Sequence, residues 1–110
     1  MTNSIVREKA MNLSVEVHRL VKNLPAEEVL EEMLIHSAAD VAVKISQAES
    51  ASTAEERIDL LVAARGKIAA VETQLSICVR VNFLEEAQIE AAVNLCAEVR
   101  KILDSELDEA

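Results

Sequence analysis

The chain has 110 residues, of which 51% are apolar, and it contains one Gly, one Pro and one aromatic side chain, Phe83. The aliphatic surface is sufficient for one buried core, so residues 1–110 are expected to form a single domain. So few turn-forming residues exclude a β-rich fold, and so much apolar surface excludes disorder. The formal net charge of −9 repels phosphate backbones and argues against general binding to nucleic acid.

The sequence also indicates a protein that neither spans a membrane nor is secreted. The longest unbroken apolar run is Leu60–Ala64, which is far shorter than the roughly 20 residues of a membrane-spanning helix. The start of the sequence lacks the apolar stretch of a secretory signal. We therefore expect a cytoplasmic protein.

The two cysteines, Cys78 and Cys96, are expected to be free and buried. Both lie in apolar stretches of the sequence. A hairpin turn near Phe83 would offset them by about 12 Å along the helix axis, which is too far for a disulfide. Buried thiols of this kind act as small apolar side chains.

Residues 4–24 are predicted to form the first helix. Apolar residues recur there at spacings of three and four, as on one side of a packed helix: Val6, Ala10, Leu13, Val17, Leu20 and Leu24. Asn3 or Ser4 can cap the start of this helix. The helix is expected to end at Leu24, because Pro25 disfavours helical geometry in the residue before it.

Residues 26–49 are predicted to form the second helix. Pro25 suits its beginning, and Glu27 and Glu28 fall in its first turn, where the helix dipole favours negative charge. One seam along this helix carries Leu30, Met33, Leu34, Ser37, Val41, Lys44, Ile45 and Ala48. Lys44 is the only charged member of that seam.

Residues 53–81 are predicted to form the third helix. Two pairs just before its apolar run have the spacing of a capping box: Ser52 with Glu55, and Thr53 with Glu56. Asn82 fits the left-handed position that follows a helix, which Gly or Asn commonly occupies.

Residues 85–107 are predicted to form the fourth helix, which begins with Glu85 and Glu86. Its apolar residues continue at helical spacing: Ile89, Ala92, Val93, Cys96, Val99, Leu103 and Leu107. Four helices of this length joined by short loops predict an all-α fold, an antiparallel up-down-up-down four-helix bundle.

The third helix is apolar on more than one side, since Leu60–Ala64 and Ile77–Val79 each cover most of a helical turn. A four-helix monomer buries only one stripe of each helix, so the surplus predicts a symmetric oligomer. The candidate interface residues are Leu60, Ala63, Gly66, Ala70 and Ile77. Gly66, surrounded by alanines, is expected to let another helix approach closely.

A specific pattern lies in the third helix and the turn after it: Ala64-Arg65-Gly66, then Glu72-Thr73-Gln74-Leu75, then Asn82-Phe83-Leu84. In the first helix and turn, Lys9-Ala10 is followed by Leu13, Val17, Leu20 and Pro25. Over about residues 5–107 the chain resembles the four-helix-bundle proteins first noticed in 23S rRNA intervening sequences. That resemblance implies a bundle that assembles into a ring, typically a homopentamer, with a non-enzymatic role.

One branch of this family is formed by the accessory proteins of diversity-generating retroelements, which work with a reverse transcriptase and bind nucleic acid through a basic surface. The family commonly carries an Arg pair where this chain has Ile35-His36. The chain is also strongly acidic, so we do not expect it to bind nucleic acid. We therefore expect an oligomeric interaction or scaffold protein with an unidentified macromolecular partner. The alternative is a nucleic-acid-binding accessory protein of the retroelement type.

The sequence predicts neither an enzyme nor a cofactor or metal site. Di-iron centres in helical bundles need Glu-x-x-His motifs, and neither His18 nor His36 follows a Glu by three positions. No Ser-His-Asp or Cys-His arrangement has local support, and the sequence has no Gly-rich phosphate loop.

Glu72 is a candidate for a structural ion pair, because Ile68–Val71 before it and Leu75 after it are apolar. A carboxylate in such surroundings needs a cationic or hydrogen-bonding partner. Arg65 lies two turns earlier on the same side of the helix, and Lys44 or Lys9 could reach Glu72 from other helices. Arg65, Glu72 and Lys44 are the residues expected to form such pairs.

Overall fold

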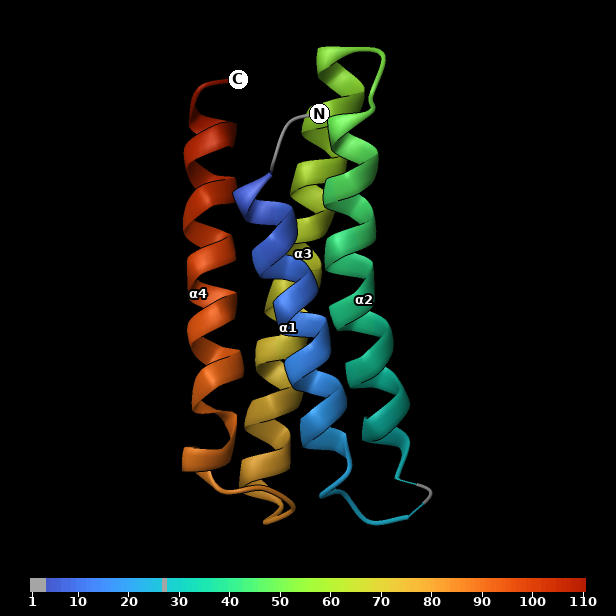
Figure 1. The fold of residues 1–110 in the computed structure, drawn as a ribbon, viewed down its shortest axis with the longest axis vertical. Coiled ribbons are helices and arrows are strands. Elements are labelled where there is room, and N and C mark those ends of the chain that lie inside the picture. Colours follow the sequence, from blue (N-terminus) through green and yellow to red (C-terminus); the bar gives the residue numbers. More distant parts are fainter. Residues whose placement is uncertain (1–3, 27) are drawn as a thin grey trace.

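The computed structural model describes residues 4–26 and 28–110 and consists of four α-helices (Figure 1). They are α1 (Ile5–Val21), α2 (Val29–Glu49), α3 (Ala54–Arg80) and α4 (Glu86–Asp108). The helices lie side by side in a body that measures 43 × 23 × 22 Å. The all-α, four-helix prediction is confirmed, whereas the symmetric assembly remains a prediction.

Each helix packs against two neighbours around the bundle. Contacts join α1 with α2, α2 with α3, α3 with α4, and α4 with α1, whereas no Cα atoms of described residues on diagonal helices come within 8 Å of each other. Neighbouring helices run in opposite directions, so that α1 begins and α4 ends at the same end of the bundle (Figure 1). Ion pairs match this register, because Arg7 near the start of α1 meets Glu49 at the end of α2.

Hydroxyl side chains cap the starts of α1 and α3. Ser4 Oγ accepts a hydrogen bond from the Arg7 backbone N–H at 3.0 Å. Thr53 Oγ1 accepts one from the Glu56 backbone N–H at 3.1 Å, which is one of the two bonds of the predicted Thr53–Glu56 capping box. The Glu56 carboxylate accepts from the Ser52 backbone N–H at 3.3 Å instead of from Thr53. These bonds satisfy backbone donors that have no partner within the helix. Asn3, the alternative cap of α1, lies outside the described residues.

The connection between α1 and α2 is longer than predicted. The helix α1 ends at Val21 because the next backbone N–H groups form tight turns, with Asn23 donating to Leu20 at 3.0 Å. Glu28 was predicted to lie in the first turn of α2, but its backbone is extended and its carboxylate caps the helix by accepting from Leu30 at 3.4 Å. Glu27 was predicted to lie in the same turn and falls outside the described residues.

The turn between α3 and α4 has the predicted left-handed residue. Asn82 has a φ of 64°. The Asn82 N–H donates to the Val79 carbonyl at 3.0 Å, and the Phe83 N–H donates to the Cys78 carbonyl at 2.9 Å. These two bonds form a Schellman motif, which satisfies the last carbonyl groups of α3 and fixes where α4 begins.

One stripe of each helix faces a shared apolar core. The largest fully buried side chains are Leu13, Leu34, Ile45, Ile68, Leu75 and Leu103, with several valines between them. Cys78 and Cys96 are free and buried in this core, as predicted. Burial raises the pKa of the Cys96 thiol to about 12. Among the described residues, no helix has the length and hydropathy to cross a membrane.

Candidate interaction surfaces

Four of the five predicted interface residues lie along the side of α3 that faces away from the core. Gly66 is exposed, Ala63 and Ala70 are half-buried, and Ile77 is 40% exposed. Leu60 differs, because it is half-buried and packs against the core of its own chain. We call Ala63, Gly66, Ala70 and Ile77 the outward row of α3.

No helix of the same chain approaches Gly66. A Cβ atom added to this residue would meet no heavy atom within 4 Å. Within the chain, no helix uses the space above Gly66, so the close approach expected there remains a prediction about a contact between subunits. Only another molecule could use the space above it.

The outward row is free of charge because charged neighbours on α3 extend sideways. Between Leu60 and Ile77 the charged residues are Arg65, Lys67 and Glu72. Arg65 pairs with Asp104 of α4 at 3.1 Å, Lys67 with Asp40 of α2 at 3.6 Å, and Glu72 with Arg100 of α4. Each charge is thus held over an adjoining helix, which leaves small and apolar side chains on the outward side.

The three ion-pair candidates all form ion pairs, but not with one another. Glu72 contacts Arg100 rather than Arg65, Lys44 or Lys9, which were the partners expected from the sequence. This partner was missed because α4 lies beside α3 on the side to which Glu72 points. Lys9 instead pairs with Glu98 of α4 at 2.9 Å.

Lys44 joins a small charge cluster between α2 and α3. Its Nζ lies 3.9 Å from an Asp40 carboxylate oxygen, and Lys67 Nζ lies 3.6 Å from the other oxygen. The seam position of Lys44 is therefore compatible with a half-buried stem and a charged end at the rim of the bundle.

A buried polar pair that sequence reasoning missed joins α2 to α3. Gln74 Nε2 donates to Ser37 Oγ at 3.2 Å, and both residues are only 8% exposed. Gln74 Oε1 is buried without a hydrogen-bond partner. A buried polar atom without a partner lowers stability, so this pair is a weak point in an otherwise apolar seam.

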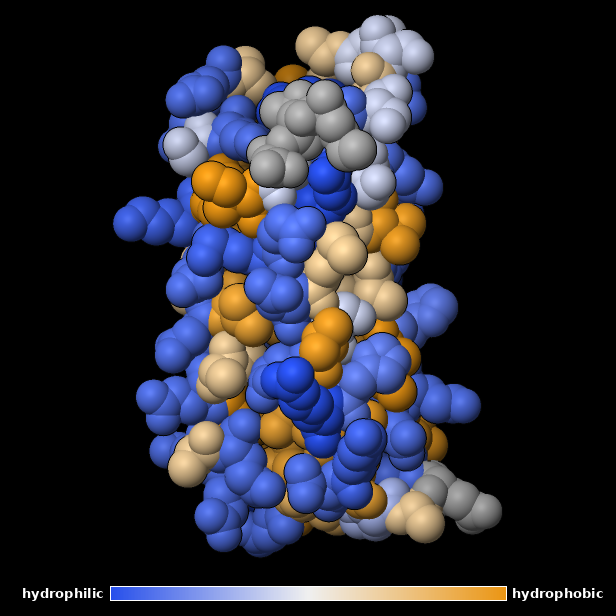
Figure 2. Space-filling model, viewed as in Figure 1, coloured by the Kyte–Doolittle hydropathy of each residue, from blue (hydrophilic) through white to orange (hydrophobic). Residues whose placement is uncertain are grey.

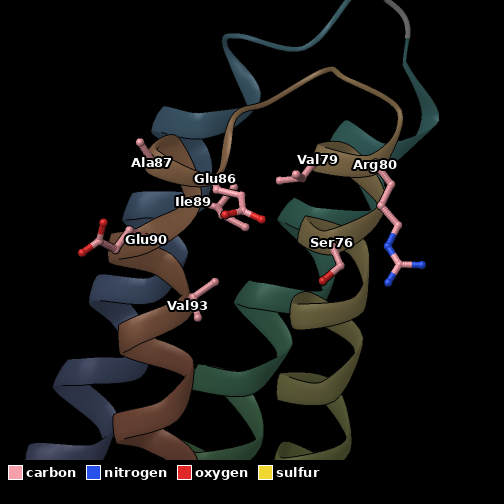
Figure 3. A pocket seen from close by; sticks show the side chains of 8 residues that line it. All are labelled: Ser76, Val79, Arg80, Glu86, Ala87, Ile89, Glu90 and Val93. Carbon is pink, nitrogen blue, oxygen red and sulfur yellow. The ribbon is translucent and has the colours of Figure 1, made fainter.

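A groove of about 620 Å³ opens between α3 and α4 near the turn that joins them. Figure 3 shows Val79 on α3 pointing toward Ile89 and Val93 on α4, with Ser76 extending into the same space. Ile89 and Val79 are half-buried, and Val93 is 36% exposed. From the sequence, these residues were expected only to be part of the apolar pattern of their helices. The groove itself was not predictable, because it is formed by side chains of two helices together.

Most basic side chains are neutralised by acidic neighbours. Eight of the 11 Lys and Arg residues form ion pairs. The other three, Lys22, Arg80 and Lys101, form no ion pair with a described residue and lie on different helices or loops. Met11 and Val15 of α1 are exposed. Figure 2 shows that hydrophobic side chains are scattered among hydrophilic ones on the face of the bundle that it presents.

Among the residues that the structure describes, no three His, Cys, Asp or Glu side chains gather closely enough to hold a metal ion. His36 lies on the surface of α2, and His18 Nδ1 is 2.9 Å from the Ser14 carbonyl within α1. Both histidines thus lie apart from the core and from each other.

Comparisons with known proteins agree with this fold. A solved structure from Bacteroides thetaiotaomicron, of a protein with unknown function from the S23 ribosomal protein family, aligns with a TM-score of 0.87. The alignment covers 94% of this chain and 98% of the other chain at 24% identity. None of the curated proteins matches the sequence. The sequence profile of 23S rRNA-intervening sequence proteins matches residues 2–105, so the chain belongs to this family.

Proposed function

We propose that this protein is a non-enzymatic scaffold whose subunits associate through the outward row of α3. The observation that carries this proposal is the uncharged side of α3 described above. Its small residues permit close approach, and its charged neighbours are already paired with α2 and α4. A contact on this row would therefore bury apolar surface without removing a charge from water.

The assembly that we propose is a homopentamer. Physical arguments alone favour a two-fold dimer, which is the commonest symmetric oligomer. The family resemblance of the sequence shifts the expectation to a five-fold ring.

Light scattering on the purified protein tests the assembly. We expect one species with the mass of five 12.0 kDa chains. Ala63→Glu and Ala70→Glu should each yield smaller species, because the new carboxylate would be buried at the subunit contact without a partner. Circular dichroism should show that both variants keep their helicity.

Ala91→Glu is the matched control, since Ala91 is an exposed alanine of α4 away from α3. This variant should keep the parent mass. A parent protein of 12.0 kDa at micromolar concentration would contradict the oligomer. A stable dimer would contradict only the pentamer.

The alternative, a nucleic-acid-binding accessory protein, has less support. The net charge is −9 and eight basic side chains are engaged in ion pairs. Binding to a nucleic acid would have to displace these carboxylates before phosphates could be neutralised. A gel-shift titration should detect no sub-micromolar binding to an unrelated duplex, and salt-sensitive binding in that range would favour the alternative.

A further inference from the structure

We propose that the groove between α3 and α4 docks an amphipathic helix of a partner protein that carries Lys or Arg beside its apolar face. This inference rests on the proposed scaffold role and names the chemistry of its partner. The groove residues that carry it are Val79, Ile89 and Val93 on the walls and Glu86 at the end nearer the turn.

The groove remains open because the ion pairs between α3 and α4 all lie farther from the turn than the groove does. Arg57–Glu106, Arg65–Asp104 and Glu72–Arg100 join the two helices there. From Glu72 to the turn, no described residue forms an ion pair across the seam. The short side chains of Ser76 and Val79 leave the walls apart, so apolar surface stays accessible.

The walls match the spacing of helix anchors. Ile89 and Val93 are one helical turn apart on α4, and Val79 faces them from α3 (Figure 3). From Glu86 to Val93 the groove extends about two turns of helix, or roughly 10 Å. A docked helix can place two apolar side chains, one turn apart, in a groove of this length.

The charge at the groove selects a basic partner. Glu86 extends its carboxylate between the two helices, and Glu90 lies on the outer side of α4 (Figure 3). Both are exposed, and neither forms an ion pair with a described residue. Arg80, the basic residue at the groove, points away from it along α3 (Figure 3). A cation on the incoming helix would therefore meet the unpaired carboxylate of Glu86, which favours the encounter and orientation of that helix.

A second copy of this chain is a poorer occupant than a partner helix. Self-association uses the outward row of α3, where Ile77 lies, whereas Ser76 and Val79 face α4. Ser76 and Ile77 line a second hollow together, so the two surfaces adjoin there. A ring contact centred on Gly66 and Ala70, which line neither hollow, leaves the groove accessible.

The test uses the intact protein and a capped peptide of about 16 residues, long enough for partial helix formation. The peptide is Ala-based, with two Leu residues four positions apart and Lys residues beside them. A matched peptide carries Glu in place of Lys. Fluorescence anisotropy measures binding of each labelled peptide. We expect the Lys peptide to bind more tightly than the Glu peptide.

Two variants of the exposed rim locate the binding site. Val93→Glu should weaken binding of the Lys peptide by about tenfold or more, as removal of a central anchor commonly does. Val43→Glu, at a valine of α2 that is 47% exposed, is the control and should change the affinity less than about twofold. Glu86→Lys should weaken binding of the Lys peptide and strengthen binding of the Glu peptide.

Three results would overturn the docking proposal. The first is no binding of the Lys peptide at about 1 mM, a concentration at which weak contacts are detected. The second is equal loss in Val93→Glu and Val43→Glu. The third is a Val93→Glu variant whose mass falls, which would make the groove a subunit contact. A parent protein that binds the peptide as a monomer would contradict the oligomer and leave the docking proposal supported.

Discussion

The two seams of α3 differ in how they are closed. Toward α2, the seam contains the buried pair of Gln74 and Ser37, and a hollow of about 570 Å³ opens beside this pair. Toward α4, three ion pairs join the helices on the side of the seam away from the turn, and an open groove lies between the Glu72–Arg100 pair and the turn. Helix periodicity alone predicts two similar seams. The difference arises from individual side chains. The buried polar pair of Gln74 and Ser37 lowers the stability of the fold, whereas the short side chains of the groove leave apolar surface that can bind a partner.

The largest difference is expected when one apolar side chain is removed from the buried core and another from the groove. Leu75 on α3 is fully buried, whereas Val93 in the groove is 36% exposed. Leu75→Ala should lower the free energy of unfolding by about 2–5 kcal/mol, because it leaves a cavity. Val93→Ala should lower it by less than about 0.5 kcal/mol. Urea denaturation monitored by circular dichroism measures both, and equal losses would mean that the groove is part of the core.

The buried pair in the α2 seam provides the next test. Ser37→Ala would leave Gln74 Nε2 without its acceptor, in addition to the unpaired Oε1. We expect the free energy of unfolding to fall by about 1–3 kcal/mol. The double variant Ser37→Ala/Gln74→Met removes both polar groups at similar volume, so it should regain most of that loss.

One result of the double-mutant cycle built from these variants would contradict this expectation. A double variant that is no more stable than Ser37→Ala would mean that Gln74 is satisfied by a water or a second copy in solution. Gln74→Met alone completes the cycle and reports the contribution of the amide.

Local features of the fold were predictable from the sequence because short-range rules decide them. Thr53 and Asn82 occupy the cap positions that their side chains favour, and Cys78 and Cys96 lie in the core that the apolar spacing indicated. The start of α2 was predicted too early, since Glu28 serves as its cap rather than its first turn.

Features that depend on two helices were not predictable in the same way. Glu72 and its partner Arg100 are 28 positions apart, and their contact depends on the rotation of α4 beside α3. The same holds for Gln74 with Ser37 and for the groove walls. The sequence marks Gly66 as a site where another helix can approach closely, but its open surroundings depend on which side of α3 faces the core.

The buried thiols, Cys78 on α3 and Cys96 on α4, should make the free energy of unfolding depend on pH. Burial raises the pKa of Cys96 to about 12 and, together with the nearby Glu28 charge, raises the pKa of Cys78. The unfolded chain loses these protons first, so each thiol stabilises the fold below its ordinary pKa, and that stability decreases as pH rises toward the raised value. Because of Cys96, the free energy of unfolding can fall by up to about 1.4 kcal/mol per pH unit above about pH 9. Urea denaturation should show a shallower slope for Cys96→Ala, and an unchanged slope would contradict a buried thiol.

The ion pairs in the α4 seam should contribute least. Arg65 and Asp104 lie 3.1 Å apart, but their side chains are 44% and 45% exposed. Water and salt screen such a pair, so its coupling energy should be about 0.2–1 kcal/mol. A double-mutant cycle with Arg65→Gln and Asp104→Asn measures the coupling at low salt and at about 1 M salt, where screening should remove most of it.

A coupling above about 2 kcal/mol that resists salt would mean that the pair is covered in solution. Because Arg65 borders the outward row of α3, such a result would indicate that a second subunit covers it. A coupling energy near zero at low salt would instead mean that apolar packing, and not this ion pair, stabilises this part of the α3–α4 seam.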